Sequence, residues 1–189
     1  NGGVFIADEV QPGFARTGQA FFGFARHGIV PDMITMGKPM GNGIPISGLA
    51  AKEDVLAAFS DKLPYFNTFG GNPVSIAAAQ AVLKYIKDEN LKEHCKKAGA
   101  ALLKALKEVQ ERHPESVGDV RGAGLFLGFE FVKNDGNKTP DKDMALNVIE
   151  MLRGEHILTS VIGHYGNILK LRPPMVFSEN DIDWFATSL

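Results

Sequence analysis

Lys38 stands at a point in the chain where a lysine amine could do covalent chemistry. It follows the short apolar run 33–36, and glycines at positions 37, 41 and 43 leave it with few bulky neighbours. Upstream, a second apolar run over 3–7 ends in Asp8. Such runs, bounded by glycine and polar residues, are typical of buried parallel strands, and parallel strands present functional groups at their carboxyl ends.

A lysine and an aspartate at the ends of two neighbouring strands suit a cofactor that carries an aldehyde and a ring nitrogen. The lysine would form a Schiff base, and the carboxylate would keep the ring nitrogen protonated so that the ring can accept electrons. Alone, each residue is weak evidence, because most loop lysines are solvated and an aspartate after a strand is often a helix cap. The combination is what indicates a cofactor site.

Together these features resemble the class-III aminotransferases of fold type I, which depend on pyridoxal 5′-phosphate. The stretches that carry the resemblance are 3–11 (GVFIADEVQ), 13–18 (GFARTG), 31–38 (PDMITMGK) and 67–73 (NTFGGNP). Their order and spacing extend the resemblance over essentially the whole chain. It implies an α/β fold with a mostly parallel sheet and flanking helices, followed by a small α+β domain.

Patterning along the chain agrees with two domains. Residues 1–113 are expected to form the C-terminal portion of the cofactor-binding large domain, including a long connector helix that ends at Pro114. Residues 114–189 are expected to form the small domain. Helices are expected over 20–28, 52–59, 72–87, 90–113 and 141–153 and after Ser178, and strands over 3–7, 33–36, 44–51 and 125–132, near 157 and over 168–171. Because the chain opens at Asn1, just before a strand, we expect it to be part of a longer polypeptide that supplies the rest of the large domain.

The resemblance implies cofactor roles for five residues. Lys38 would form the Schiff base and then move the proton of the substrate carbon, and Asp8 would hold the ring nitrogen. Val10 shares the side of Asp8 by strand alternation and would pack on the ring, while Gln11 would bind the phenolic oxygen. Thr68 precedes a helix start and would bind the cofactor phosphate of the neighbouring subunit, so a homodimer with a shared active site is expected.

Two alternatives remain open at this point. Asp8 could be a cap or a group that braces a loop, and Thr68 could belong to a plain turn before a helix. Because successive side chains of a strand point to opposite sides, Glu9 is expected to point away from Asp8. We therefore expect Glu9 to brace the loop that contains Arg16.

The substrate side departs from the aminotransferase pattern. Many class-III aminotransferases carry an arginine for the substrate carboxylate three residues before a Pro-Pro pair, and this chain has Lys170 there. Arg172 precedes the prolines and shares the face of Lys170 by alternation. Lysine is a point charge and does not replace a bidentate guanidinium. The change resembles the phospho-lyase branch, which acts on ethanolamine phosphate or phosphohydroxylysine and is similar to alanine–glyoxylate aminotransferase 2; its members have lysine in this stretch, and a cationic pair would suit a phosphate.

The expected activity is amino transfer between an amine or amino acid and a keto acid. One alternative is a phospho-lyase that eliminates phosphate from an O-phosphorylated amine. The other is an inactive piece that serves only dimerisation or structure, because the phosphate loop and the stacking aromatic of the family do not occur in these 189 residues.

The composition indicates which kinds of partner and which cellular compartment to expect. The net charge is −2 with a pI near 6.2 and the cations are scattered, so nucleic acid is not expected as a partner. A single cysteine, Cys95, and the lack of a signal peptide or of roughly 20 consecutive apolar residues favour a cytoplasmic protein without a membrane partner. The five histidines have no metal-ligand spacing, so no metal is expected.

Overall fold

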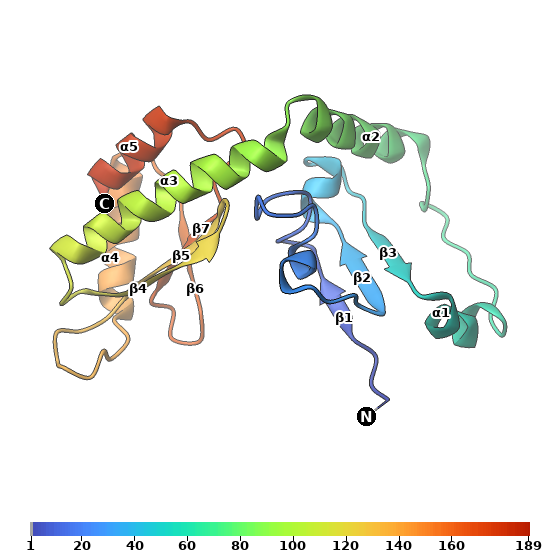
Figure 1. Cartoon of the computed structure of the whole chain (residues 1–189), viewed down its shortest axis with the longest axis horizontal. Coiled ribbons are helices and arrows are strands. Elements are labelled where there is room, and N and C mark those ends of the chain that lie inside the picture. The colour runs from blue at the N-terminus through green and yellow to red at the C-terminus, as the bar shows by residue number, and fades with distance from the viewer. Residues whose placement is uncertain (1) are drawn as a thin grey trace. The chain divides into compact units, whose positions relative to one another are not determined.

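Two sheets organise the chain, one in each of two compact units (Figure 1). The structure is a computed structural model and describes residues 2–189. The first unit extends to Lys92, and the second runs from Glu93 to Leu189.

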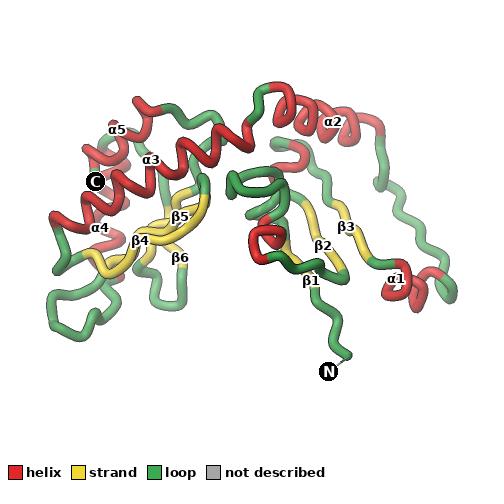
Figure 2. The backbone as a smooth tube through the Cα atoms, in the orientation of Figure 1, coloured by secondary structure: helices red, strands yellow, loops and turns green. Residues whose placement is uncertain are grey.

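The first unit contains three strands and four helical segments: β1 (Ile6–Asp8), η1 (Gly23–His27), β2 (Met33–Met36), η2 (Lys38–Gly41), β3 (Gly48–Ala51), α1 (Glu53–Ser60) and α2 (Pro73–Asp88). The strand order is β1-β2-β3, with β1 parallel and β3 antiparallel to β2. Asp8 pairs in register with Thr35, so the ends of β1 and β2 are neighbours, as predicted. Outside η1, the β1–β2 connection is loop, as is the long α1–α2 connection (Figure 2).

Three predicted elements of this unit are shorter in the structure. The strand expected to be buried over 3–7 is limited to β1, and Val4, Phe5 and Ile6 are exposed. The helix expected over 20–28 is only the 3-10 segment η1, and the strand expected over 44–51 is limited to β3. Pro45 lies in the part that is not strand, where it has no backbone N–H to donate to a ladder.

The second unit is an α+β layer with an antiparallel sheet of order β4-β5-β7-β6. Its elements are α3 (Leu91–Arg112), β4 (Val117–Ala123), β5 (Phe126–Phe131), α4 (Lys142–Gly154), β6 (Ser160–Ile162), β7 (Ile168–Leu171) and α5 (Glu179–Ser188). The expected α/β fold with an α+β C-terminal region is therefore confirmed. Strand β4 was not predicted, because Gly118 and Gly122 interrupt its apolar pattern and its first pairings carry a β-bulge.

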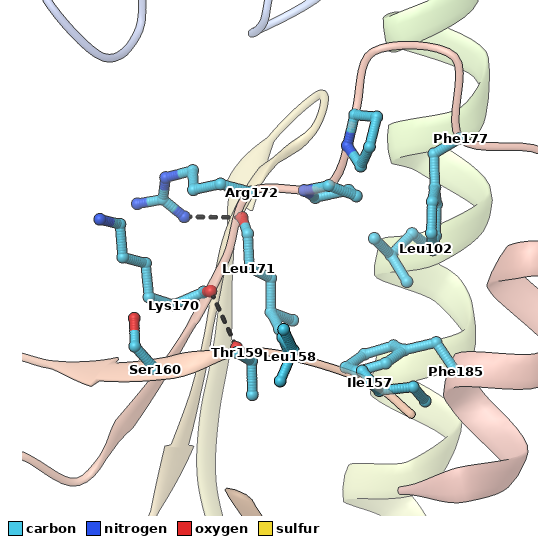
Figure 3. A pocket seen from close by; sticks show the side chains of 12 residues that line it. Leu102, Ile157, Leu158, Thr159, Ser160, Lys170, Leu171, Arg172, Phe177 and Phe185 are labelled. Atoms are coloured by element: carbon cyan, nitrogen blue, oxygen red, sulfur yellow. Dashed lines mark hydrogen bonds between the residues drawn. The ribbon is translucent and has the colours of Figure 1, made fainter. Parts of the chain in front are cut away.

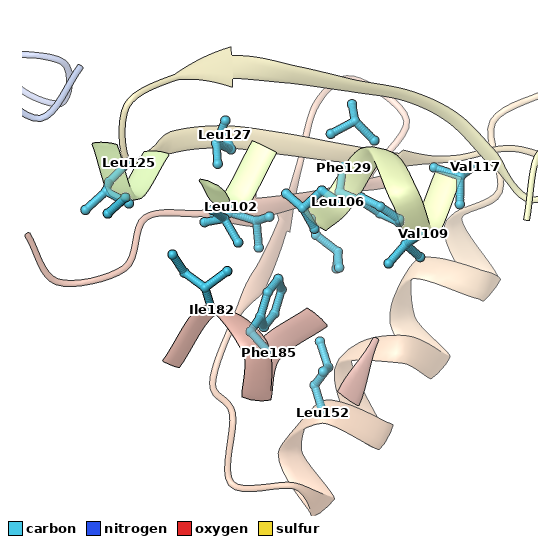
Figure 4. Packing of buried hydrophobic residues seen from close by; sticks show 14 of the residues in the cluster. Leu102, Leu106, Val109, Val117, Leu125, Leu127, Phe129, Leu152, Ile182 and Phe185 are labelled. Atoms are coloured by element: carbon cyan, nitrogen blue, oxygen red, sulfur yellow. The ribbon is translucent and has the colours of Figure 1, made fainter. Parts of the chain in front are cut away.

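Helices α3, α4 and α5 contribute to one apolar core with the sheet of the second unit (Figure 4). An apolar stripe along α3 supplies Cys95, Ala98, Leu102, Leu106 and Val109, all buried. On the sheet side, the buried residues alternate with half-buried ones along β5 and β7. The sequence-based domain boundary after residue 113 stays a prediction, but α3 packs with the unit that follows it, because its stripe completes this core.

Across residues 2–189 there is no helix that combines the length and the apolar character needed to cross a membrane. The same residues contain no cluster of three or more histidine, cysteine or carboxylate side chains arranged to hold a metal ion.

Candidate active site

The carboxylate of Asp8 is held in place at the end of β1. Its Oδ1 accepts a hydrogen bond from the Val10 amide at 3.1 Å and one from the Thr35 hydroxyl at 3.4 Å. Because Thr35 is the register partner of Asp8, the second bond joins the ends of the two parallel strands. The side chain is exposed. Asp8 therefore does brace its own loop, and it also presents an oriented carboxylate at the strand ends.

Lys38 lies just beyond the end of β2 and opens η2. It is exposed, and its φ of 41° is in the left-handed region, which is uncommon for a residue with a side chain. Within residues 2–189, no hydrogen bond or ion pair engages its amine. Strained backbone of this kind is found at functional sites more often than elsewhere. An exposed lysine beside the end of a strand is accessible to an aldehyde.

Val10 lies next to the backbone that leads into Lys38. A Cβ on Gly37 would be 3.9 Å from the Cγ1 atom of Val10. Val10 also lines a cavity of about 650 Å³, together with Thr35, Met36, Ser47, Gly48, Leu49, Tyr65, Asn67, Gly70 and Gly71. This cavity brings Val10 together with the turn that contains Thr68. The side chains of Lys38, Asp8, Gln11 and Thr68 do not line it, and Gln11 and Thr68 are exposed.

Glu9 is turned away from Asp8, as the alternation predicts. Only 2% of it is exposed, and its two carboxylate oxygens accept hydrogen bonds of 2.7 Å each from the amides of Gly23 and Phe24. It therefore braces the segment at the start of η1, which lies just beyond the loop of Arg16. A buried carboxylate must be paired to be tolerated, and here backbone donors do this.

The turn that holds Thr68 is built by side-chain amides. Asn67 Oδ1 accepts from the amides of Phe69 and Gly70 at 3.1 Å, and Asn72 caps α2 by accepting from the Ser75 amide at 3.0 Å. Ser75 was not singled out from the sequence. Its buried hydroxyl donates to the Pro45 carbonyl at 3.1 Å and so ties the start of α2 to the loop that follows Lys38. The Asn72-Pro73 pair signals the start of the helix, but no local pattern signals the long-range partner of Ser75.

Lys170 lies in β7 of the second unit and Arg172 follows its last residue, and the two side chains extend to the same side (Figure 3). Both line a cavity of about 420 Å³ that also includes Thr159 and Ser160. The guanidinium of Arg172 is 3.3 Å from the centroid of the Phe126 ring, and its Nη1 donates to the carbonyls of Leu127 at 2.6 Å and Leu171 at 2.7 Å. Arg172 is thus engaged in the sheet itself.

A second cationic side chain, Arg121 on β4, is engaged by carboxylates. Its Nη1 donates to Asp119 at 2.6 Å and also to Glu130. The pKa of Arg121 is raised above its usual value, first by the hydrogen bond to Glu130 and then by that to Asp119. Asn167, which is buried, donates to the Phe131 carbonyl at 2.7 Å and to the other oxygen of Glu130 at 3.4 Å.

The residues at the strand ends of the first unit fit a flat heterocycle with an aldehyde, a protonated ring nitrogen and a phenolic oxygen. Lys38 offers an unengaged amine, Asp8 an oriented acceptor, Val10 an apolar surface and Gln11 a neutral donor. The set agrees with the donor chemistry of a pyridoxal 5′-phosphate site.

The fold is the one found in PLP-dependent enzymes of fold type I. The model of the family described as aminotransferase class-III matches residues 1–189, so the chain belongs to that family. Members of the family depend on pyridoxal 5′-phosphate, and they include both transaminases and phospho-lyases.

Individual relatives are of both kinds. The chain is 44% identical to the ethanolamine-phosphate phospho-lyase homolog 1 of Caenorhabditis elegans, over all of this chain and 41% of that protein. It is 41% identical to the mitochondrial alanine–glyoxylate aminotransferase 2 homolog 2 of Arabidopsis thaliana, over all of this chain and 39% of that protein. The chain thus spans about two fifths of the length of these relatives.

The solved structures that resemble this chain also include both a phospholyase and an aminotransferase. A phospholyase from Arthrobacter in complex with phosphoethanolamine superposes with a TM-score of 0.94 at 40% identity, covering 99% of this chain and 44% of that one. An aminotransferase from Bacillus anthracis superposes with a TM-score of 0.89 at 37% identity, covering 98% of this chain and 43% of that one. The similarity to relatives of both kinds confirms the family and the fold, and it leaves the reaction to be proposed.

Proposed function

We propose that this chain supplies the covalent lysine and the ring-nitrogen carboxylate of a PLP-dependent enzyme acting on a primary amine, with amino transfer to a keto acid as its reaction. The observation that carries the proposal is the parallel pairing of β1 and β2, which sets Asp8 beside Thr35, three residues before Lys38. Because the chain spans 41% of its phospho-lyase relative, the proposal places it within a longer polypeptide.

Each residue has a defined task in this proposal. Bound pyridoxal 5′-phosphate supplies an electron sink for the carbon next to the substrate amine. Lys38 would hold the cofactor covalently through its amine, and the same amine would move the proton of that carbon. Asp8 keeps a proton on the ring nitrogen, Val10 packs against the ring, and Gln11 donates a hydrogen bond to the phenolic oxygen.

The test is borohydride reduction of the cofactor-loaded protein, followed by peptide mapping. Label is expected on Lys38, and Lys38→Ala is expected to abolish both label and turnover. Lys52→Ala is the matched control, because Lys52 also follows a strand of this sheet but is engaged by Asp32 at 2.7 Å. Label on any lysine other than Lys38 would show the assignment to be wrong.

A second candidate reaction, the elimination of phosphate from an O-phosphorylated amine, is favoured by Lys170. A lysine at this position lacks the fork that holds a carboxylate, but it suits a phosphate. In elimination, removal of the proton from the carbon that bears the amine is followed by cleavage of the neighbouring C–O bond, and the bonding electrons leave with phosphate. Phosphate release without a keto acid would identify this reaction, whereas amino transfer requires the keto acid.

We also propose that Thr68 acts across a homodimer, at the cofactor phosphate of the second copy. Four large side chains near it in the sequence are mostly exposed: Tyr65 (75%), Phe66 (85%), Phe69 (83%) and Val74 (71%). A surface of this kind is typical of one that a partner covers. Phe66→Asp is expected to shift the full-length protein from dimer to monomer in sedimentation velocity, and an unchanged dimer would contradict this role.

Membership of the family does not determine the cellular compartment of the protein. We propose that the protein is cytoplasmic. None of the described helices could span a membrane. Of the two relatives above, the Arabidopsis thaliana protein is named as mitochondrial and the Caenorhabditis elegans protein is not. Localisation of the tagged full-length protein in cells tests it directly.

A further inference from the structure

The loop that begins with η2 contains two residues with left-handed backbone. Lys38, which opens η2, has a φ of 41°, and Asn42, which follows its last residue, has a φ of 46°. Asparagine tolerates this conformation, but for a lysine it is unfavourable and persists only where the surrounding structure holds it. The contacts of this loop therefore decide where the amine of Lys38 lies.

Inside the loop, the contacts are short in range. The amide of Asn42 donates to the Pro39 carbonyl at 3.2 Å, and that of Ile44 donates to the Gly41 carbonyl at 3.1 Å. Gly41 is buried, and a Cβ on it would lie 2.7 Å from the Cγ2 atom of Ile46. The 3-10 segment η2 and the residues after it are thus packed together, so a contact on those residues also restrains η2.

Helix α2 holds those residues through Ser75. The hydroxyl of Ser75 donates to the Pro45 carbonyl at 3.1 Å, although 30 positions separate the two residues in the sequence. Only 8% of Ser75 is exposed, so water competes little for this bond. Pro45 stands between Ile44 and Ile46, both of which have atoms within 4 Å of the Cβ position of Gly41. The bond therefore fixes the part of the loop on which η2 packs.

Asn72 directs the hydroxyl of Ser75. Its Nδ2 donates to the Ser75 oxygen at 3.1 Å, which leaves the hydroxyl hydrogen for the Pro45 carbonyl. The same Nδ2 donates to the Phe69 carbonyl at 3.1 Å, and Oδ1 accepts from the Ser75 amide at 3.0 Å as the cap of α2. The side chain of Asn72 thus has two separable tasks, since capping uses its oxygen and directing the hydroxyl uses its nitrogen.

We propose that Ser75 is a positioning residue for Lys38 and that Asn72 orients it for this task. Ser75 acts through the backbone of the loop and not on the amine itself. Without its bond, Lys38 can relax from the left-handed conformation to an ordinary one, and the amine then leaves its place beside the end of β2. This inference goes beyond the proposed function and rests on it only for the chemistry of the amine.

Two measurements on the full-length protein test this role. Amide hydrogen exchange of the cofactor-free protein reports how often residues 38–46 open, and stopped-flow absorbance reports the rate at which Lys38 captures added pyridoxal 5′-phosphate. Ser75→Ala keeps the amide that donates to Asn72 but removes both bonds of the hydroxyl. It is expected to speed exchange in residues 38–46 and to slow capture, each by roughly three- to tenfold, as the loss of one net hydrogen bond predicts. Ser75→Thr, which keeps the hydroxyl, is expected to restore both.

Asn72→Asp separates positioning from capping. Aspartate caps a helix as well as asparagine does, but it has no nitrogen to donate, and its carboxylate can draw the Ser75 hydroxyl away from Pro45. Faster exchange in residues 38–46 and slower capture are therefore expected, whereas a residue that only capped α2 would leave both unchanged. Gln80→Glu adds the same charge at an exposed position of α2, and Ser60→Ala removes an exposed hydroxyl at the end of α1. Both controls should behave as the parent does.

The role of Ser75 and the proposed function can fail separately, because exchange in the cofactor-free protein does not involve PLP. A borohydride label on Lys38, with exchange or capture in Ser75→Ala equal to that of the parent, would keep the PLP chemistry and overturn the role of Ser75. A label on another lysine, with faster exchange in Ser75→Ala, would refute the proposed function and keep Ser75 as the residue that holds the Lys38 loop.

Discussion

Asp8 and Glu9 are adjacent carboxylates in opposite surroundings. The side chain of Asp8 is exposed and oriented by Val10 and Thr35, whereas Glu9 is buried against two backbone amides. Strand alternation sends them to opposite sides. Asp8 therefore presents an oriented carboxylate at the strand ends, as the proposed cofactor role requires, and Glu9 holds the nearby backbone in place.

Replacing Asp8 should affect the cofactor more than the fold. Asp8→Asn keeps an oxygen that can accept from Val10 but removes the negative charge. We expect cofactor affinity to fall roughly 10- to 100-fold, because a hydrogen bond to a charged group is worth about 1.5–3 kcal/mol. Absorbance titration with pyridoxal 5′-phosphate measures this in the full-length protein. Asp54→Asn, at an exposed position of α1, is the control, and equal affinities of the two variants would contradict the role of Asp8.

Replacing Glu9 should affect the fold. In Glu9→Ala, the amides of Gly23 and Phe24 lose their acceptor, and each unsatisfied donor costs about 1–3 kcal/mol when buried. Both residues are half-buried, so we expect a loss of about 2–3 kcal/mol in the free energy of unfolding. Urea denaturation measures it, with Glu89→Ala as an exposed control. A midpoint equal to that of the control would show that the bracing contacts contribute little.

At the scale of elements, helix α3 approaches the β4–β5 turn so closely that a side chain does not fit between them. A Cβ on Gly99 would lie 2.3 Å from the carbonyl carbon of Gly124 and 2.4 Å from its Cα. These are backbone atoms of a turn, and they cannot move aside as a flexible side chain can. Gly99 therefore sets how closely this helix packs on the sheet.

Gly99→Ala separates helix propensity from packing. Propensity alone predicts a gain of about 1 kcal/mol, whereas the contact with Gly124 predicts overpacking that costs about 1–3 kcal/mol. We expect a net loss of stability, measured by thermal or urea unfolding. Gly154→Ala at the end of α4 is the control, because no neighbouring atom lies within 4 Å of its Cβ position. A stabilised Gly99→Ala variant would contradict the close approach.

Asp32, just before β2, joins the residue before β1 to the residue after β3, and it should make this part of the first unit sensitive to acid. Its carboxylate accepts from Lys52 at 2.7 Å and from the Phe5 amide at 2.8 Å, and its pKa is lowered, first by the Lys52 hydrogen bond and then by the Phe5 bond. A lowered folded-state pKa means that the stabilisation is fully present above the ordinary aspartate pKa near 4 and is lost as the pH falls through the lowered value.

Thermal unfolding of the chain and of Asp32→Asn between about pH 6 and pH 2 tests this sign, since that range spans the ordinary aspartate pKa. The difference between the two melting temperatures should be largest at the upper end and should shrink toward the lower end. A difference that grew on acidification would contradict it.

At the scale of the whole molecule, the buried apolar side chains are unequally divided. The continuous core from Cys95 to Phe185 lies in the second unit. The first unit buries few large apolar side chains and exposes many, among them Val4 (54%), Phe5 (47%) and Ile6 (52%) on or next to β1. Since burial of apolar area is the main driving force of folding, the two units should differ in autonomy.

Residues 93–189 expressed alone are therefore expected to fold cooperatively. Their amide spectrum should be dispersed and should overlay the matching signals of the whole chain. Residues 2–92 alone should bind a hydrophobic dye and show little signal dispersion, because their apolar surface lacks a cover. A cooperative melt of 2–92 with a disordered 93–189 would reverse this expectation.

Much of the site could be predicted from the sequence because its signals are local. The apolar runs before Asp8 and Lys38, the Asn72-Pro73 helix start and the stripe of α3 each depend on residues within a few turns or one strand. The opposite orientations of Asp8 and Glu9 followed from the period of two. Strand β4 was missed because its pairing with β5 is not visible in its weak local pattern. The short extent of β3 was missed because the loss of strand pairing around Pro45 is not visible there either.

The amino-acid sequence alone indicated the family, the candidate lysine with its candidate carboxylate partner, and the ends of most helices. Each of these depends on residues within a short segment of the chain. Only the tertiary structure decided which side chains are already engaged: Glu9 by Gly23 and Phe24, Arg172 by Phe126 and two carbonyls, and Arg121 by Asp119 and Glu130. Most of these contacts join residues far apart in the sequence. They form only when packing brings whole elements together, so no local pattern records them.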